Sequence, residues 1–411
     1  MVVTAAAAAT PGAPVASPTR PGLRPISPWS FAAVAVVSFG GPLALAALYG
    51  PQAVSDLSSG SALAALAAPV IFGLPLWIWL RYSRHVHGPS GLTGFVRAAA
   101  GPKVAAVQGA VWTVSYLLYL VYTTAYVVYD VLPAVSGRVA GYRSTLEVVL
   151  PIAIAAVVVT GRRVTVVTLA GIAIGQLALV VLLDVVAIRH GSSSSAFSTA
   201  ALSRPGQAHE FATVTGDVAL LFVCGSLPLF FGGELATPVR TVRRVLPAVF
   251  VLTAVVVVVA VLPLALDPAF GRAAIPGMSL VSVDVGSGVA TAVGIGVAAS
   301  VVGVMIVEYA ALVRLGHAFT GRSMPVVARW LAVPLVVAGP ISLIDPDRFY
   351  ELLIKPSLVA LWLSQLIVVA VYPRFAVRHG GRTLPHVAAA CGASAVMLFG
   401  LWNSLSNAAS T

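Results

Sequence analysis

Long apolar segments with few charges constrain this chain more than any other feature of its sequence. A helix that crosses the hydrocarbon core of a bilayer needs about 20 mostly apolar residues. About eleven segments come close to this length: 29–49, 62–80, 104–128, 146–160, 164–186, 213–235, 245–266, 288–313, 330–344, 350–372 and 384–401. We therefore expect an all-α membrane protein with about eleven transmembrane helices, of which the fourth and ninth are the shortest.

Composition excludes a water-soluble protein of this size. Only 9% of the residues are charged and 59% are hydrophobic, whereas soluble domains carry about 25% charged residues. The net charge of +11 would suggest a nucleic-acid partner in a soluble chain. Here the basic residues gather between the apolar segments, as Lys and Arg do in cytoplasmic loops. The lipid bilayer is therefore the expected partner, and a nucleic-acid partner is not expected.

The positions of the basic residues also predict the topology. With the N-terminus in the cytoplasm, most of the 24 Lys and Arg residues fall on the cytoplasmic side. Residues 1–28 are rich in Ala, Pro, Thr and Ser, and they are predicted to form a disordered cytoplasmic tail. We expect a multi-pass protein of the cell membrane.

The segments fall into two sets that match in outline. Residues 29–187 and 213–372 each hold five segments, with a long loop after the second and a short fourth segment. Because five is an odd number, the second set enters the membrane from the opposite side, which gives an inverted repeat. Residues 384–402 form an additional transmembrane helix.

Both sets begin with a segment that is broken near its middle. Residues 38–42 read Ser-Phe-Gly-Gly-Pro, and residues 224–228 read Cys-Gly-Ser-Leu-Pro. Proline and glycine weaken a helix, and unwound backbone within a membrane is tolerated where it is buried or lines a cavity. The matched breaks predict a substrate site built from Ser38, Phe39, Gly40, Gly41, Cys224, Gly225 and Ser226. Simple kinks, or small-residue faces for close helix packing, are the alternative.

The third segment carries tyrosines at helical spacing. Tyr116 and Tyr119 could hydrogen-bond a substrate carboxylate, or they could form a packing stripe. Tyr126 and Tyr129 are expected in the outer aromatic belt.

Three further polar residues within the segments are candidates for coupling or gating. They are Asp217, Ser300 and Glu308, and each is costly to bury unless it has a role or a partner. Asp217 could instead offset the positive start of its helix. Glu308 could pair with a loop arginine, or it could act as a titrating carboxylate at the inner gate. Oxygen ligands for sodium are scarce, so proton coupling or exchange is expected in preference to sodium symport.

Three stretches at corresponding places resemble elements of one transporter family. Residues 87–97 are similar to the Pro-x-Gly-Gly-x-Tyr segment that follows its second span, and residues 234–247 are similar to its Glu-Glu-x-x-Asn-Pro-x-Arg-x-x-Pro signature. Residues 309–314 with Met324 and Pro325 are similar to its Ser-Arg element and Leu-Pro turn. On these stretches the chain resembles the amino acid–polyamine–organocation (APC) superfamily, which includes the amino acid permeases.

The resemblance implies a five-plus-five inverted repeat of the LeuT type, which works by alternating access with substrate between spans 1, 3, 6 and 8. The family's Gly-Phe-Glu of span 6 falls on Cys224, Gly225 and Ser226. The aromatic residue and the acid are missing there, which implies a smaller pocket or a different substrate.

We therefore expect a secondary active transporter of amino acids or related small amines. The coupling ion, including protons as a second partner, stays open. A transport-inactive sensor or scaffold on the same fold, or a channel, is the alternative. An enzyme is not expected, because no catalytic motif stands near the seven histidines. No cofactor and no metal are expected, and the His85-x-His87 pair is interpreted as a solvated loop element.

Overall fold

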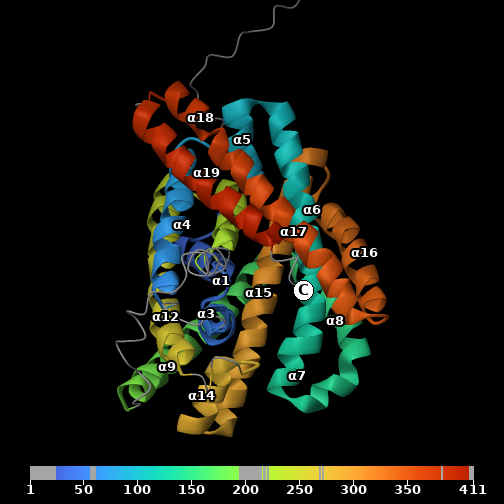
Figure 1. The fold of residues 1–411 in the computed structure, drawn as a ribbon. Coiled ribbons are helices and arrows are strands. Elements are labelled where there is room, and N and C mark those ends of the chain that lie inside the picture. Colours follow the sequence, from blue (N-terminus) through green and yellow to red (C-terminus); the bar gives the residue numbers. More distant parts are fainter. Residues whose placement is uncertain are drawn as a thin grey trace, which may run out of the picture.

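The structure, a computed structural model, describes residues 25–55, 62–193, 215, 219, 222–267, 270, 273–380 and 383–406. Within these ranges the regular elements are helices, and the one β-bridge joins Ile26 and Leu235. Nine of the described helices are long and apolar enough to cross a membrane, and Leu66–Tyr82 is a shorter apolar helix. The prediction of an all-α, multi-pass membrane protein is confirmed (Figure 1).

The first half of the chain contains the elements of the first five predicted spans. The broken first span comprises α1 (Pro28–Ser38), α2 (Pro42–Ala44), the π-helical η1 (Leu45–Tyr49) and α3 (Gly50–Ser55). The remaining elements are α4 (Ala62–Tyr82), α5 (Gly91–Ala100), α6 (Pro102–Tyr126), η2 (Val127–Val131), α7 (Leu132–Val135), η3 (Gly137–Tyr142), α8 (Arg143–Val159) and α9 (Arg162–Ser193).

In the second half, the first element whose bounds are described is a 3₁₀-helix, η4 (Val223–Glu234), and Thr215 and Ala219 before it are helical. The second half continues with α12 (Pro238–Leu266), α14 (Pro276–Asp284), α15 (Ser287–Thr320), α16 (Met324–Ser342), α17 (Pro346–Ala370), α18 (Tyr372–Arg378) and α19 (Thr383–Ser406). Many of these helices begin at a proline, because the first helical position needs no N–H donor. Each of the two long predicted loops carries a helix, α5 in one and α14 in the other.

The two short spans pack against each other. α8 contacts α16 extensively, and Gly339 permits this approach, because a Cβ there would lie 2.2 Å from the carbonyl oxygen of Glu147. α17 packs between α6 and α19. In the middle of the chain's packing, α15 contacts each of α1, η4 and α6.

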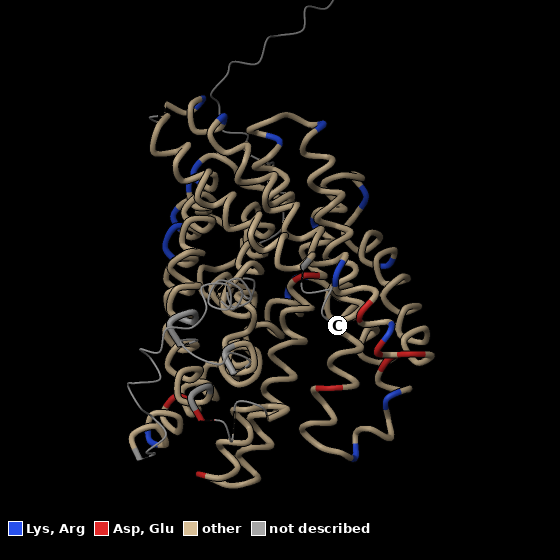
Figure 2. The backbone as a smooth tube through the Cα atoms, viewed as in Figure 1, with Lys and Arg blue, Asp and Glu red and all other residues tan. Residues whose placement is uncertain are grey.

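Charge is distributed unevenly along the molecule. Most Lys and Arg residues lie toward the end that carries α5 and α18, and most Asp and Glu residues lie nearer the end that carries α14 (Figures 1 and 2). We name these the basic end and the α14 end. The predicted positive-inside pattern therefore reappears as a difference between the two ends of the folded molecule.

Candidate functional site

The first span is interrupted at two glycines. α1 ends at Ser38 and α2 begins at Pro42, and between them Gly40 and Gly41 have φ angles of 76° and 66°. This left-handed conformation is readily adopted only by glycine, which explains the glycine pair. The helix that restarts at Pro42 has no side-chain cap. Its N-cap residue, Gly41, has no side chain that could accept from the first N–H groups.

From Val223 to Glu234 the sixth span is a 3₁₀-helix. η4 contains Pro228, which cannot donate the hydrogen bond that a regular α-helix requires. The Ser226 hydroxyl bonds within η4, donating to the Val223 carbonyl oxygen at 3.1 Å, and it accepts a bond of 3.4 Å from Gln365 on α17. The backbone near the second predicted break is therefore tighter than an α-helix.

Glycines bring the two interrupted spans and α15 into close contact. A Cβ on Gly225 would lie 2.1 Å from the Phe39 ring, and a Cβ on Gly41 would lie 2.1 Å from the Ser300 hydroxyl oxygen. Phe39 also packs against Phe250, with ring centroids 5.7 Å apart. Ser300 donates a 2.6 Å hydrogen bond to the Gln176 side chain of α9. A side chain at either glycine would force the spans apart.

A cavity of about 230 Å³ lies beside these breaks. It is lined by the first span and by residues of α6, η4, α15 and α17: Gly40, Leu45, Tyr49, Tyr119, Tyr122, Thr123, Tyr126, Val223, Cys224, Val301, Val304, Tyr350, Ile354, Leu358 and Leu361. The tyrosine rings pack on one another; Tyr49 stacks on Tyr126 at 6.0 Å and Tyr122 meets Tyr350 edge-on at 5.3 Å. The lining is aromatic and aliphatic, with hydroxyl groups as its polar side chains.

Some of the predicted substrate residues line this cavity and others do not. Gly40, Tyr119 and Cys224 are lining residues. The others lie in the packed layer behind or beside it: Ser38, Phe39, Gly41, Tyr116, Gly225 and Ser226. Asp217 lies outside the described residues. Substrate binding by any of these residues stays a prediction.

Sequence reasoning missed part of the lining. Tyr126 was expected in the outer aromatic belt, but it lines the cavity and stacks on Tyr49. Tyr350, on α17, was not considered. Helical periodicity places Tyr119, Tyr122 and Tyr126 on one face of α6, but it cannot show that α17 completes the wall opposite.

Glu308 is completely buried in α15, and none of the arginines in the described ranges forms an ion pair with it. One carboxylate oxygen accepts a hydrogen bond from the Cys224 thiol at 3.6 Å, and the other oxygen has no hydrogen-bond partner in the described part of the chain. Of the alternatives considered for Glu308, an ion pair with an arginine is not seen among the described residues, and a titrating role stays a prediction. Arg314, six residues further along α15, forms its ion pair with Glu234.

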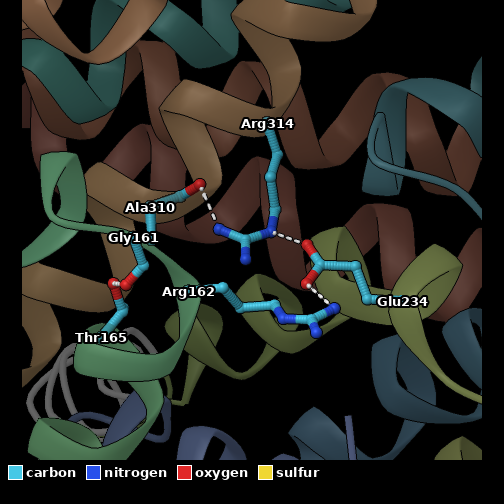
Figure 3. Close-up of polar contacts among 6 residues, drawn as sticks. All are labelled: Gly161, Arg162, Thr165, Glu234, Ala310 and Arg314. Carbon is cyan, nitrogen blue, oxygen red and sulfur yellow. Dashed lines mark hydrogen bonds and ion pairs between the residues drawn. The ribbon is translucent and has the colours of Figure 1, made fainter. Parts of the chain in front are cut away.

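Arg314 belongs to an ion-pair network near the basic end (Figure 3). Its Nε donates to Glu234 Oε1 at 2.7 Å, and Arg162 approaches the other oxygen of Glu234 at 3.6 Å. The Arg314 guanidinium also lies 3.6 Å from the centroid of the Phe231 ring. The backbone N–H of Ile26 donates to the Glu234 carbonyl oxygen at 2.9 Å. The network, which we call the Glu234 network, joins the chain before α1 to η4, α9 and α15.

The geometry of α15 places this network beyond the cavity. Val304 lines the cavity, and Arg314 lies ten residues further along the same helix, which is about 15 Å at 1.5 Å per residue. Glu308 lies between them. The order along α15 is therefore cavity, buried carboxylate and ion-pair network.

The His85-x-His87 pair lies beside another histidine of the same end of the molecule. His85 packs on His379 with ring centroids 4.4 Å apart, and no cluster of three or more His, Cys, Asp or Glu residues suited to a metal occurs among the residues described. Burial lowers the pKa of His85, and the neighbouring His379 and Arg84 lower it further. The lowered pKa favours the neutral imidazole of His85, which is exposed, near neutral pH.

No family model matches this chain, and no curated protein matches it. Among solved structures it is similar to the crystal structure of MhsT in complex with L-phenylalanine. The two share 16% sequence identity over 93% of this chain and 100% of the MhsT chain, with a TM-score of 0.64. The chain has the fold of MhsT. The predicted LeuT-type architecture is thereby confirmed at the level of the fold.

Proposed function

We propose that this chain is a secondary active transporter that moves amino acids across the membrane by alternating access. The observation that carries the proposal is the cavity beside two interrupted spans, which is lined by residues of the first span, α6, η4, α15 and α17. Its volume of about 230 Å³ is somewhat below the range of about 300–1,000 Å³ that is common for ligand sites. A single amino acid is therefore a better match than a long polyamine.

The lining favours an amino acid with an apolar or aromatic side chain. Tyrosine rings and aliphatic groups cover the wall, and none of the described lining residues carries a formal charge. The helix that restarts at Pro42 leaves the backbone N–H groups of Leu43 and Ala44 without a capping side chain at Gly41, and N–H groups at a helix start attract a carboxylate. MhsT was crystallised with L-phenylalanine, which makes L-phenylalanine the first substrate to test.

The Glu234 network supports an alternating-access cycle. It joins several segments that would have to separate for the cavity to open toward the basic end. By the positive-inside rule this end faces the cytoplasm, which agrees with an N-terminus in the cytoplasm and a location in the cell membrane. The three sequence stretches that resemble APC elements favour membership of the APC superfamily. If the chain is a transporter, it is not expected to be an enzyme as well.

A binding screen followed by a flux assay tests the proposal. The purified protein is heated with each of the common amino acids, and a ligand that binds the folded state raises the unfolding temperature. Proteoliposomes loaded with unlabelled L-phenylalanine, or with the best ligand of the screen, are then given the labelled compound outside. Saturable counterflow is expected.

A matched pair of glycine variants localises the site. Gly225→Ala places a methyl group against Phe39, whereas Gly232→Ala, in the same 3₁₀-helix, meets no atom within 4 Å. Counterflow is expected to fall strongly in the first variant and to persist in the second. Binding without any flux would indicate a sensor, and an ohmic current would indicate a channel; either result contradicts the proposed transport function.

A further inference from the structure

Glu308 is the most unusual polar residue near the cavity. Its side chain is 0% exposed, and it lies in the middle of a helix that is buried along most of its length. In the described part of the chain, the ion pairs of Arg162, His190 and Arg314 go to other carboxylates and none reaches Glu308. The free oxygen of Glu308 therefore has neither a hydrogen-bond donor nor a counter-charge.

An ionised carboxylate is unstable in such a position. Burying an unpaired charge costs several kcal/mol, and a carboxyl group without a cation is more stable in its protonated form. Within the membrane region, an ionisable side chain without a structural partner points to a functional role. The packing of Glu308 shows no structural need for a charge there.

Cys224 connects Glu308 to the cavity. The thiol lines the cavity wall and also donates to Glu308 Oε1, so one side chain separates the carboxyl group from the cavity. The other titratable side chains that interact with Glu308 are Tyr116, Tyr119 and Tyr122 of α6. None of these neighbours is a base that could hold the proton in place of Glu308 at neutral pH.

We propose that Glu308 is the proton-carrying residue of the transporter and that it couples the movement of an apolar amino acid to a proton moving in the same direction. This inference rests on the proposed function. The coupling depends on water in the cavity. Without substrate, water in the cavity lies one side chain away from the Glu308 carboxyl group, beside Cys224 and the tyrosine hydroxyls, and lowers the free-energy cost of the ionised form. An apolar amino acid displaces this water and makes the ionised form more costly.

Proton and substrate binding therefore favour each other. With the cavity open on one side, the Glu308 carboxylate takes a proton from water on that side, which forms an O–H bond as the substrate enters. With the cavity open on the other side, substrate leaves, water returns, the O–H bond breaks and the proton passes to that water. One proton and one amino acid have then crossed, and the carboxylate is regenerated.

Because proton binding and substrate binding affect each other equally, their coupling can be measured at equilibrium from either side. Binding of L-phenylalanine to the purified wild-type protein is expected to tighten as the pH falls, by at most about tenfold per pH unit for one linked proton. The same binding in weakly buffered solution is expected to take up protons, as a pH indicator would report. In Glu308→Gln, which keeps the shape but cannot ionise, the affinity is expected to be independent of pH.

Flux in proteoliposomes separates coupling from transport. The wild-type protein is expected to accumulate labelled L-phenylalanine when the outside is made acidic. Glu308→Gln is expected to retain counterflow but to lose this accumulation. Glu351→Gln removes an exposed carboxylate on α17 and is the matched control; it is expected to behave as the wild type.

The possible failures are distinguishable. If the wild-type protein shows no counterflow of L-phenylalanine or any other amino acid, the proposed function fails. If counterflow occurs but binding takes up no proton, the role of Glu308 is wrong. The same conclusion follows if Glu308→Gln accumulates substrate in response to the pH gradient. The proton-uptake measurement needs no variant, so it decides the question even if Glu308→Gln does not fold.

Discussion

Replacing Glu234 by Gln is expected to open the cavity toward the basic end. Glu234 is the shared acceptor of Arg314 and Arg162, and its side chain is only 17% exposed, while that of Arg314 is 5% exposed. Glutamine keeps one oxygen as an acceptor but removes the negative charge. Two arginines then face each other without a counter-ion, which favours separation of η4 from α15 and α9.

The size of the effect follows from the burial of the pair. Removing one partner of a buried ion pair costs about 3–5 kcal/mol. The residual exposure of Glu234 and the remaining amide oxygen argue for the lower value, about 3 kcal/mol. Since each 1.4 kcal/mol changes an equilibrium constant about tenfold, the open fraction can rise by about a hundredfold.

The chain contains a natural reporter for this opening. Cys224 lines the cavity, and the other cysteine, Cys391, is exposed on α19 and can be replaced by alanine. A membrane-impermeant maleimide is applied to vesicles from the basic side, and the rate of Cys224 labelling is measured by mass. The rate is expected to rise in Cys391→Ala/Glu234→Gln compared with the Cys391→Ala parent.

The control is Arg240→Gln, which removes an exposed charge from α12 at the same end of the molecule. It is expected to leave the labelling rate at the parental value. The reasoning is refuted if Glu234→Gln labels no faster than the parent while its thermal unfolding shows that it is folded. It is also refuted if both variants accelerate labelling equally, because the effect would then be one of general surface charge.

Two further predictions concern stability. Gly41→Ala is expected to lower the unfolding temperature more than Gly101→Ala. Both glycines have positive φ, but of the two only the new Cβ at Gly41 would meet an atom, the Ser300 hydroxyl oxygen at 2.1 Å. Equal decreases of the unfolding temperature in a thermal melt would argue against close packing at the break. The pKa values of His85 and His87 lie below the usual value of about 6.5, chiefly because burial disfavours the imidazolium form. The unfolded chain therefore binds more protons, so stability present above pH 6.5 is expected to decrease as the pH falls below it. Melting at pH 7.5 and 5.5 measures this loss, which His85→Gln should reduce; an unchanged loss would mean that His85 does not contribute.

The sequence predicted the broken first span for local reasons. Gly40 and Gly41 adopt a conformation that only glycine adopts readily, and Pro42 suits a helix start, so the break is encoded within a few residues. The sixth span shows the same principle at Pro228, where the described chain forms a 3₁₀-helix. Candidate sites next to such breaks are therefore predictable without knowledge of the packing.

The partners of the buried charges were not predictable in this way. The sequence shows Glu308 six residues before Arg314, and a pairing of Glu308 with a loop arginine was the natural expectation. In the folded chain Arg314 pairs with Glu234, 80 positions away, and Glu308 is left beside Cys224. Which carboxylate meets which cation depends on how η4 lies against α15, and no local pattern encodes that contact.

The sequence by itself determined that the chain is helical, that it spans a membrane many times, and that its first span is interrupted at two glycines. These properties follow from hydropathy over about 20 residues and from the backbone preferences of glycine and proline, which are local. The tertiary structure alone decided that Tyr126 and Tyr350 complete the cavity wall and that Glu308 is buried with no counter-charge from the part of the chain that the structure describes. Both depend on contacts between helices distant in sequence, and such contacts form only when the whole bundle packs.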